Sequence, residues 1–380
     1  MSGDLGRFDL AVVGAGICGL AHALAAARRG LKVAVIDRDA QANGASIRNF
    51  GFVTVTGQQD GDCWRRAMRS RDVWAEVAPA AGIRVEHRGL AVAVRRPEAV
   101  AVLEAFRATA MGEACELLTA AAAQERFPML RGEELRAALW SPHELRVESR
   151  EAIPKLARWL AEAHGVTFFY QTLVQAVELP TVATTRGRIT APRCVVCPGD
   201  DFLGLFADRF AAYGLTRCKL HMLRVAPSRA LPSFTAAVMS DLGLVRYLGY
   251  AELPEAAALK RRLEAEQPEH LAHGIHLIAV QSADGSLVVG DSHHYGPTPD
   301  PFGPTAVDEL ILDEFRRVVA LPEPMVSERW IGTYASAPDR LMLVDRPADH
   351  VRLVAITSGT GASTSFAIAE EVMAELLGEE

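Results

Sequence analysis

The segment of residues 10–37 constrains the fold of this chain more than any other. A short apolar run, LAVV, is followed by Gly14, Gly16 and Gly19 in the spacing G-x-G-x-x-G, and then by an alanine-rich helical pattern. A second apolar run ends at an acid, Asp37, about 20 positions beyond the glycines. This order of strand, glycine turn, helix, strand and acid predicts a βαβ unit that binds a dinucleotide.

Each of these residues has a physical task in that pattern. Gly14 permits a tight turn, Gly16 lets backbone N–H groups approach a pyrophosphate at the positive end of the helix, and Gly19 allows close packing of helix on strand. Asp37 can accept hydrogen bonds from the ribose hydroxyls of an adenosine, and Arg38 follows it directly. We therefore expect a bound dinucleotide rather than an ordinary βαβ unit with a glycine-rich turn.

Composition and charge exclude several classes of function. The chain has 380 residues, enough for two domains, and its 49% hydrophobic and 23% charged content is typical of a globular protein. The net charge of −7 argues against a surface that binds nucleic acid. No apolar run reaches the length of about 18 residues that a membrane helix needs, so we expect no integral membrane segment. Six scattered cysteines without a disulfide framework favour a cytoplasmic location.

The sequence predicts no metal site. Cys194 and Cys197 form a C-x-x-C pair, but they lie in a buried-strand pattern and no second pair follows, so neither zinc nor a redox pair is expected. His293 and His294 are adjacent, and adjacent residues of a strand point to opposite faces. They are therefore not expected to share a metal ion.

The rest of the chain carries helix and strand patterns. Helical spacing predicts helices over 62–81, 97–111, 149–164, 253–267 and 305–320. Strand patterns cover 84–95, 166–170, 172–178, 193–199, 219–226, 236–239 and 244–250, and a hairpin is predicted over 276–292. A second glycine-rich turn, SGTGAS at 358–363, again lies between a strand and a helix. Two such turns can present helix N-termini to one long cofactor, which favours a flavoprotein because the second helix can stabilise an anionic reduced flavin.

With these motifs, the chain resembles the superfamily of FAD-dependent oxidoreductases that includes D-amino-acid oxidase, glycine oxidase and sarcosine oxidase. The resemblance runs from about residue 8 to 378. It is carried by the glycine fingerprint at 14–37, GASIRNFG at 44–51, CPG at 197–199, RWIGTYASAPD at 329–339 and SGTGAS at 358–363. The run ASIRNFGFVTVTGQ at 45–58 resembles a narrower subgroup associated with phosphonate catabolism.

The resemblance implies a mixed α/β (α+β) fold with two domains. A Rossmann-like FAD-binding domain would comprise 1–88, 141–216 and 327–380. A mainly antiparallel-sheet substrate domain would comprise 89–140 and 217–326.

The resemblance also implies positions that contact FAD. Ser46, Arg48 and Asn49 match the loop that passes the pyrophosphate and the flavin, and Val174 matches the position whose backbone meets the adenine. The other matched positions are Gly199, which lets the chain pass close to the cofactor, and the flavin-facing turn of Gly359, Thr360, Gly361, Ala362 and Ser363.

Two departures from the family are informative. Gly332 stands where sarcosine oxidases have the cysteine that is bonded to flavin, so FAD is expected to be non-covalent. Ser363 stands where those enzymes have a lysine that holds the substrate carboxylate. An α-amino acid is therefore less favoured here than an amine with a different acidic group, such as an aminophosphonate.

Flavin-dependent amine oxidation requires mainly orientation. A neutral amine must point its C–H at flavin N5, hydride transfer follows, and the imine hydrolyses. The candidate substrate contacts are Arg48, His221, Met222, Tyr247, Tyr250 and Tyr334, of which Arg48, His221 and Tyr334 are candidate catalytic residues. His221 could instead be an ordinary half-buried histidine, and Tyr247 and Tyr250 could belong to the core.

A phosphonate would need cationic partners. Those available are Arg48, Lys219, Arg246 and Arg329, and the sequence does not choose among them.

The resulting prediction is FAD-dependent oxidative deamination of a small primary or secondary amine to an aldehyde. 2-Aminoethylphosphonate or its N-methyl form is the candidate substrate, and oxygen is the expected electron acceptor, as in an oxidase rather than a dehydrogenase. One alternative is an oxidase or dehydrogenase of glycine, sarcosine or a D-amino acid. The other is an FAD-carrying subunit of a larger dehydrogenase. The sequence makes no prediction of oligomeric state.

Overall fold

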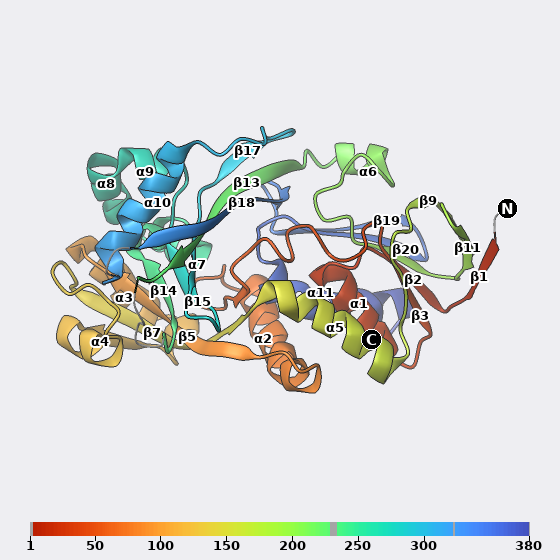
Figure 1. Ribbon diagram of the computed structural model, residues 1–380, viewed down its shortest axis with the longest axis horizontal. Coiled ribbons are helices and arrows are strands. Elements are labelled where there is room, and N and C mark those ends of the chain that lie inside the picture. The colour runs from red at the N-terminus through yellow and green to blue at the C-terminus, as the bar shows by residue number, and fades with distance from the viewer. Residues whose placement is uncertain (1–2, 229–233, 322–323, 380) are drawn as a thin grey trace.

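The computed structural model describes residues 3–228, 234–321 and 324–379 and contains three sheets. A ten-stranded sheet lies at one end of the molecule, a six-stranded sheet lies in the middle, and a four-stranded sheet lies at the end near the N-terminus (Figure 1). None of the helices in these described ranges is long and apolar enough to cross a lipid bilayer.

The six-stranded sheet contains the predicted βαβ unit. Five of its strands are parallel and β19 is an antiparallel edge strand. In sheet order the strands are β19 (Met342–Ala348), β20 (Val351–Ile356), β12 (Cys194–Val196), β2 (Leu10–Val13), β3 (Val33–Ile36) and β8 (Thr167–Phe169). The apolar runs predicted as buried strands are therefore confirmed.

Both faces of this sheet are covered, which explains why its strands read as continuous apolar runs. Val33 and Val35 of β3 pack into a core with four helices, whereas Ala34 and Ile36 pack into a core shared with the four-stranded sheet. The helices are α1 (Ile17–Ala27), α2 (Asp62–Ala80), α5 (Ser149–His164) and α11 (Gly361–Leu377).

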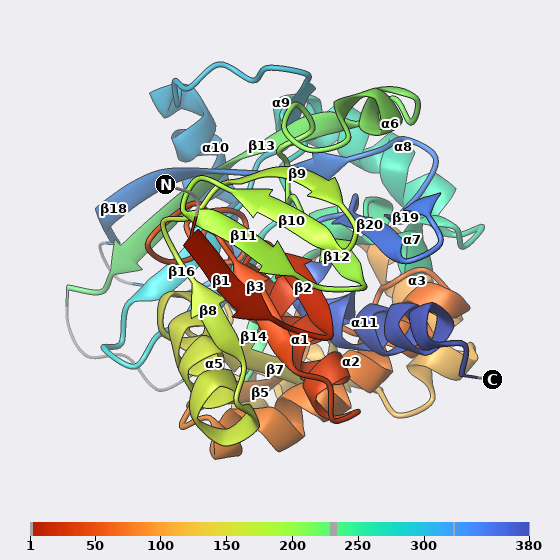
Figure 2. The ribbon, with the colours of Figure 1, turned by 90° about the vertical axis from the view of Figure 1, so that its right-hand side faces the viewer.

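The four-stranded sheet is a hairpin extended on both sides, and Figure 2 shows it from the end of the molecule. Its strands are β1 (Gly3–Arg7), β11 (Gly187–Thr190), β10 (Thr181–Thr184) and β9 (Val174–Glu178). The β10–β11 pair is antiparallel, and β1 joins it in parallel.

The ten-stranded sheet is antiparallel except for the parallel pair of β14 with β5. Its main path is β17 (His294–Gly296), β13 (Thr216–Ala226), β16 (Leu287–Gly290), β15 (Ile278–Gln281), β14 (Ala237–Ser240), β5 (Val85–Val94), β7 (Ala137–Val147) and β4 (Phe52–Val53). In addition β18 (Met325–Ser336) pairs with β13, and β6 (Glu116–Thr119) pairs with β7. The predicted fold class, a Rossmann-like part with a mainly antiparallel sheet, is confirmed.

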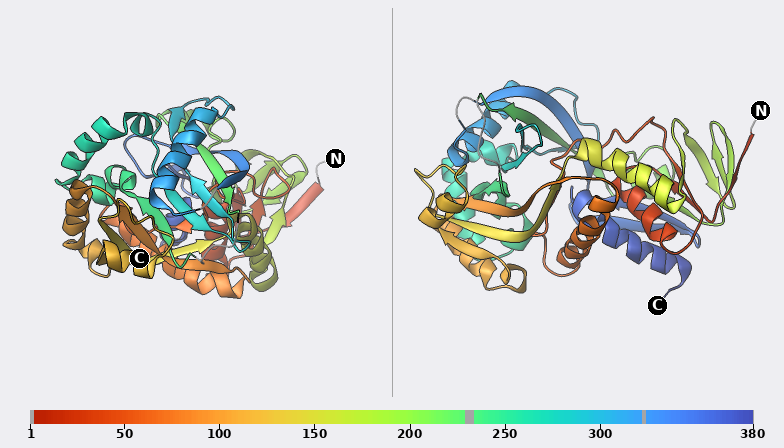
Figure 3. Two further views of the ribbon diagram at one scale, coloured as in Figure 1. Left: turned by 60° about the vertical axis from the view of Figure 1, so that its left-hand side comes forward. Right: turned by 60° about the horizontal axis from the view of Figure 1, so that its bottom comes forward.

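Helices surround the outer side of this sheet, at the end of the molecule away from the N-terminus (Figure 3). They are α3 (Pro97–Arg107), η1 (Ala110–Gly112), α4 (Ala120–Arg126), α8 (Ala256–Glu266), α9 (Pro268–Ala272) and α10 (Thr305–Val318). The short helix α6 (Ala207–Ala211) lies between β12 and β13 in the chain.

The strand predicted over 244–250 is wrong. The segment instead forms the 3-10 helix η2 (Asp241–Val245) and the short helix α7 (Leu248–Ala251). The physical reason is a close approach: a side chain on Gly249 would collide with the backbone of Gly57 and Gln58, so the segment packs as a compact helical turn. This change decides which way the two predicted tyrosines of this segment point.

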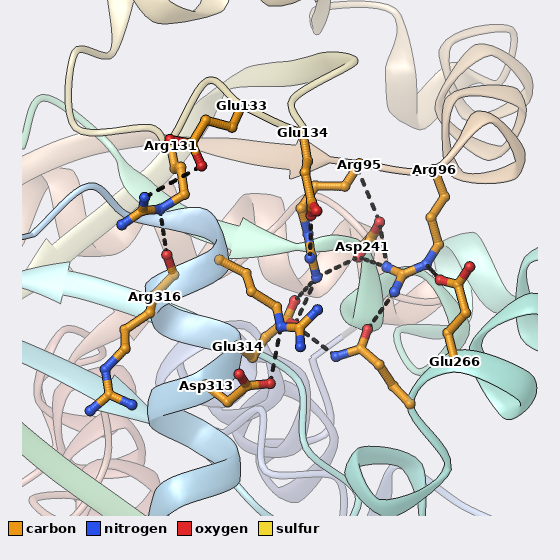
Figure 4. Close-up of polar contacts among 12 residues, drawn as sticks. Arg95, Arg96, Arg131, Glu133, Glu134, Asp241, Glu266, Asp313, Glu314 and Arg316 are labelled. Atoms are coloured by element: carbon orange, nitrogen blue, oxygen red, sulfur yellow. Dashed lines mark hydrogen bonds and ion pairs between the residues drawn. The ribbon is translucent and has the colours of Figure 1, made fainter.

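A buried ion-pair network fixes η2 to the sheet (Figure 4). Arg96 donates from Nη1 to both oxygens of Asp241, at 2.9 and 3.0 Å, and Arg95 donates from Nη2 to Glu314 of α10 at 2.8 Å. Glu266 completes the shell with a bond from Arg96 Nε at 2.7 Å. Because the chain continues from η2 to Arg246 and Tyr247, this network also positions the site described next.

Candidate active site

A cavity of about 420 Å³ is lined by residues of both the six-stranded and the ten-stranded sheet, and we call it the central cavity. It collects most of the positions predicted from the sequence. The predicted residues that line it are Gly16, Gly19, Ser46, Arg48, Asn49, Gly199, Arg246, Tyr247, Gly332, Tyr334, Gly359, Thr360, Gly361, Ala362 and Ser363.

The glycine turn at α1 is held by side chains from two directions. Asp37 accepts hydrogen bonds from the backbone N–H of Ala15 (Oδ2, 2.7 Å) and of Asp39 (Oδ1, 2.9 Å). Ser46 accepts a hydrogen bond from the N–H of Ile17 at 2.9 Å. A side chain on Gly19 would collide with the carbonyl oxygen of Gly14, as the close packing predicted there requires. The turn is therefore fixed before any ligand enters.

The loop around Asn49 is braced internally. Its amide donates to the Ala45 carbonyl at 2.6 Å and accepts from the Gly51 N–H at 2.7 Å, so this side chain shapes the loop. The Arg48 carbonyl accepts a bond from the Trp330 indole at 3.1 Å, and a Cβ added to Gly332 would lie 3.1 Å from the same oxygen. Glycine at this position thus allows the loop and β18 to approach closely.

The N-terminus of α11 lies at the same cavity as that of α1. Gly359 has a φ of 74°, and a Cβ there would lie 3.1 Å from the Tyr334 ring, so the turn packs against this tyrosine. Ser363 is buried and accepts a hydrogen bond from the Thr54 N–H at 2.8 Å. Two helix N-termini with preformed glycine turns fit a long dinucleotide whose phosphates lie at one end and whose flavin ring lies at the other.

The other end of the central cavity carries polar side chains from the ten-stranded sheet and from the segment after η2. Arg246 donates to the Tyr295 hydroxyl at 2.9 Å, and no carboxylate of the described residues lies within ion-pair distance of it, although Asp291 lines the same cavity and interacts with it. Burial raises the pKa of Tyr334 well above its ordinary value, so its phenol remains protonated and able to donate. This end can therefore bind an anionic group and donate a hydrogen bond.

Three of the predicted substrate residues do not line the cavity. His221 alternates on β13 with the cavity-lining Leu220, and its Nδ1 lies 3.1 Å from Asp308 of α10 on the opposite side. Met222 and Tyr250 are fully buried, and the Tyr250 ring packs against Phe106 with centroids 4.6 Å apart.

Two of the four candidate cations are also absent from the cavity lining and already paired. Lys219 bonds to Asp300 at 3.1 Å and Arg329 to Asp308 at 2.9 Å. Four predicted cofactor positions are likewise outside the lining: Gly14, Asp37, Arg38 and Val174. Of these, Arg38 pairs with Asp201 at 2.6 Å.

Three buried polar residues of this cavity were not predicted as site residues, and His293 among them was expected only not to share a metal ion with His294. His276, Asp291 and His293 all line the central cavity and are almost completely buried. Burial raises the pKa of Asp291 to about 7 and lowers the pKa of both imidazoles well below the ordinary value. The signal that could have found them is the predicted hairpin, because its two strand ends bring 276 opposite 291.

A cysteine pair was also missed. Cys18 of α1 and Cys197, which follows β12, both line the central cavity, and a hydrogen bond from Cys197 lowers the pKa of Cys18 to about 5. The structure thus associates Cys197 with Cys18 rather than with Cys194, its partner in the C-x-x-C pattern, which is fully buried in β12.

Comparisons with known proteins agree with this architecture. The family described as FAD dependent oxidoreductase (DAO) matches residues 9–376. A search of curated proteins finds no match.

Among solved structures, the chain is similar to glycine oxidase from Bacillus cereus ATCC 14579, with 17% identity and a TM-score of 0.78 over 98% of this chain and 96% of that one. The chain is also similar to L-proline dehydrogenase from P. horikoshii, with 20% identity and a TM-score of 0.79 over 99% of this chain and 95% of that one. A third similar structure is iminodiacetate oxidase from Chelativorans sp. BNC1, with 19% identity and a TM-score of 0.73 over 98% of this chain and 96% of that one. At sequence identities of 17–20%, this structural similarity establishes the fold alone.

Proposed function

The chain belongs to the family of FAD-dependent oxidoreductases, and from this premise we propose that it oxidises a small primary or secondary amine that carries a separate acidic group. The substrates we favour are 2-aminoethylphosphonate and its N-methyl derivative. When bound, FAD supplies the hydride acceptor, and oxygen restores its oxidised form. Hydrolysis of the imine product then gives an aldehyde, with ammonia released from a primary amine and methylamine from the N-methyl derivative.

The residues that would hold FAD come from the two glycine turns. The backbone of 16–19, supported by Ser46, would meet the pyrophosphate at the N-terminus of α1. The turn at 359–363 would face the flavin ring from the N-terminus of α11. Asp37 would serve the adenosine end, and Gly332 offers no thiol for a covalent bond, so FAD is proposed to bind non-covalently.

The observation that carries the substrate proposal is that the cation of Arg246 lies in the cavity without a close ion pair. Its guanidinium is only partly exposed, lines the central cavity and has no carboxylate within ion-pair distance among the described residues, and Asp291 of the same cavity interacts with it at longer range. Leaving a cation in such a place is costly unless an anion joins it. Arg48 lines the same cavity, and among the residues that the structure describes its side chain bonds only to the Asn43 amide, at 3.3 Å. Two guanidinium groups that form no close ion pair with a carboxylate of the described residues suit a phosphonate, which carries up to two negative charges.

Tyr334 is the proposed orienting residue near the reacting carbon. Its ring packs against Gly359 of the flavin-facing turn, and its protonated hydroxyl can donate to the substrate. With the anion held by Arg246, these contacts would leave the amine and its neighbouring C–H between Tyr334 and the turn. Catalysis would then depend on orientation rather than on a dedicated acid–base pair.

The test is a substrate panel measured by anaerobic bleaching of the flavin absorbance and by steady-state kcat/KM. The panel contains 2-aminoethylphosphonate, its N-methyl derivative, glycine, sarcosine and D-alanine. We expect the phosphonates to exceed the others by about tenfold or more, equivalent to about 1.4 kcal/mol in the transition state. Peroxide formation in air would identify an oxidase.

Matched variants sharpen this test. Arg246→Met removes a cavity cation and is expected to lower kcat/KM for the phosphonate about 10- to 100-fold without loss of flavin. Lys219→Met removes a cation that is paired outside the cavity lining and is expected to change little. A tenfold preference for glycine or D-alanine would refute the phosphonate substrate but not amine oxidation. Absence of bleaching with every amine would refute both.

A further inference from the structure

We propose that His276, Asp291 and His293 form a binding site for a divalent metal ion of the zinc type, and we call them the His–Asp–His cluster. Two imidazoles and one carboxylate are a common ligand set for such ions. The cluster lines the central cavity, so the coordination positions that these three residues leave open would face the cavity and take water or an oxyanion. This proposal does not rest on the proposed substrate.

The hairpin of β15 and β16 brings the three ligands together. His276 precedes β15 and Asp291 follows β16, and their backbones bond to each other in both directions, at 3.4 and 3.2 Å. His293 lies two residues beyond Asp291, and its backbone N–H is held by the His273 carbonyl at 2.9 Å. Short, paired backbone segments therefore fix all three side chains.

The separations between the donor atoms approach those around a small metal ion. His276 Nδ1 lies 3.4 Å from Asp291 Oδ1, and His293 Nε2 lies 3.8 Å from Asp291 Oδ2. All three donor atoms lie within 4.8 Å of one another. Tetrahedral ligands at about 2.1 Å from zinc lie about 3.4 Å apart, so donor atoms up to 4.8 Å apart must approach by up to about 1.4 Å to close the site.

The lone pairs needed for coordination are free. His293 Nδ1 lies 2.8 Å from the Gly274 carbonyl, so it carries the proton and Nε2 keeps its lone pair. Metal-binding histidines are typically held in this way. His276 Nδ1 and Asp291 Oδ1 have no hydrogen-bond partner among the described residues, although both residues are at least 95% buried. Buried polar atoms without partners are unfavourable, and a cation between them removes that cost.

Nearby charge and a second histidine pair define the site further. Arg246 lines the same cavity, and its positive charge disfavours the binding of a metal ion. The Asp291 carboxylate, when ionised, neutralises one of the two positive charges of the metal ion. We therefore expect weaker binding than in a structural zinc site, and tighter binding when Arg246 is neutralised. His273 and His294 instead bond to each other at 2.9 Å and provide a control outside the cluster.

The experiment uses the purified FAD-loaded chain, stripped with a chelator and titrated with Zn²⁺ and with Co²⁺, without substrate. Calorimetry and elemental analysis measure affinity and stoichiometry, and the Co²⁺ absorption bands report tetrahedral geometry. We expect one ion per chain. His276→Gln and Asp291→Asn should each weaken binding at least about tenfold, His273→Gln should bind like the parent, and Arg246→Met should bind more tightly.

Flavin content and the melting temperature of each variant show whether it is folded. The parent and Arg246→Met titrations keep the test valid if a cluster variant does not fold. The proposal is overturned if the parent binds no ion at about 100 µM free Zn²⁺, because a dissociation constant above that concentration would be too weak for a functional site. Equal affinity in the parent, His276→Gln and Asp291→Asn also overturns it. If the cluster serves only to hold the ammonium group of a substrate, the parent would bind no metal ion.

Discussion

Replacement of Asp37 by alanine tests how the glycine turn is prepared for FAD. The carboxylate accepts two backbone hydrogen bonds, one from Ala15 in the turn and one from Asp39 beyond it. The substitution removes both, together with the negative charge that we propose meets the ribose. The fold should survive, because Asp37 follows the end of β3 and is only partly buried.

The expected loss follows from these contacts. A hydrogen bond to a charged group contributes about 1.5–3 kcal/mol, and the partial exposure of Asp37 places each bond at the low end of that range. We expect FAD binding to weaken by about 2–3 kcal/mol, which corresponds to a dissociation constant about 30- to 150-fold higher. Asp37→Asn keeps one acceptor oxygen and should lie between the parent and Asp37→Ala.

The assay is titration of the apoprotein with FAD, followed by the change in flavin fluorescence. A matched control is Asp9→Ala, because Asp9 accepts a backbone bond from Lys32 at 2.8 Å in the same βαβ unit but does not line the cavity. This control should bind FAD like the parent. The reasoning is refuted if Asp37→Ala stays within about threefold of the parent, a difference below 1 kcal/mol, or if Asp9→Ala weakens binding as much.

Three further outcomes follow from the structure. Asp241→Ala should lower the free energy of unfolding by about 3–5 kcal/mol in a denaturant titration, because it leaves Arg96 buried without this partner. Burial beside Arg146 lowers the pKa of His87 to about 3, so folding favours the neutral imidazole. The free energy of unfolding should therefore fall as the pH drops below about 6.5, by at most about 1.4 kcal/mol per pH unit. In urea titrations between about pH 6.5 and 5, His87→Gln should reduce this slope. Gly19→Ala forces a side chain against the Gly14 carbonyl, so the purified variant should lack flavin absorbance; normal flavin content would contradict the packing.

Local patterns predicted the parts of the site that local chemistry dictates. The glycine turns at 14–19 and 358–363 require specific backbone conformations, and both lie where the sequence put them. Arg48, Gly332 and Tyr334 reach the central cavity as well. The proposed domain boundaries and the individual ligand contacts stay predictions.

The remaining site residues depend on information that a single sequence does not carry. The alternation of β13 predicts that Leu220 and His221 face opposite sides, but only the assembled sheet decides which side is the cavity. Tyr247 faces the cavity and Tyr250 the core because the segment is helical, which in turn depends on the packing of Gly249 against a distant turn. His276 and Asp291 meet only through the pairing of two strands.

The position of β20 and α11 has a consequence for how the protein is made on the ribosome. β20 lies inside the six-stranded sheet beside β12, and α11 covers α1 and α2. At translation rates of about 5–20 residues per second, roughly 15 to 70 seconds separate the synthesis of α1 from that of α11. During this interval the apolar surface of α1 lacks its final partner, and the second glycine turn does not yet exist. We therefore expect FAD uptake to follow the synthesis of α11, and nascent chains stalled before residue 351 to bind no flavin.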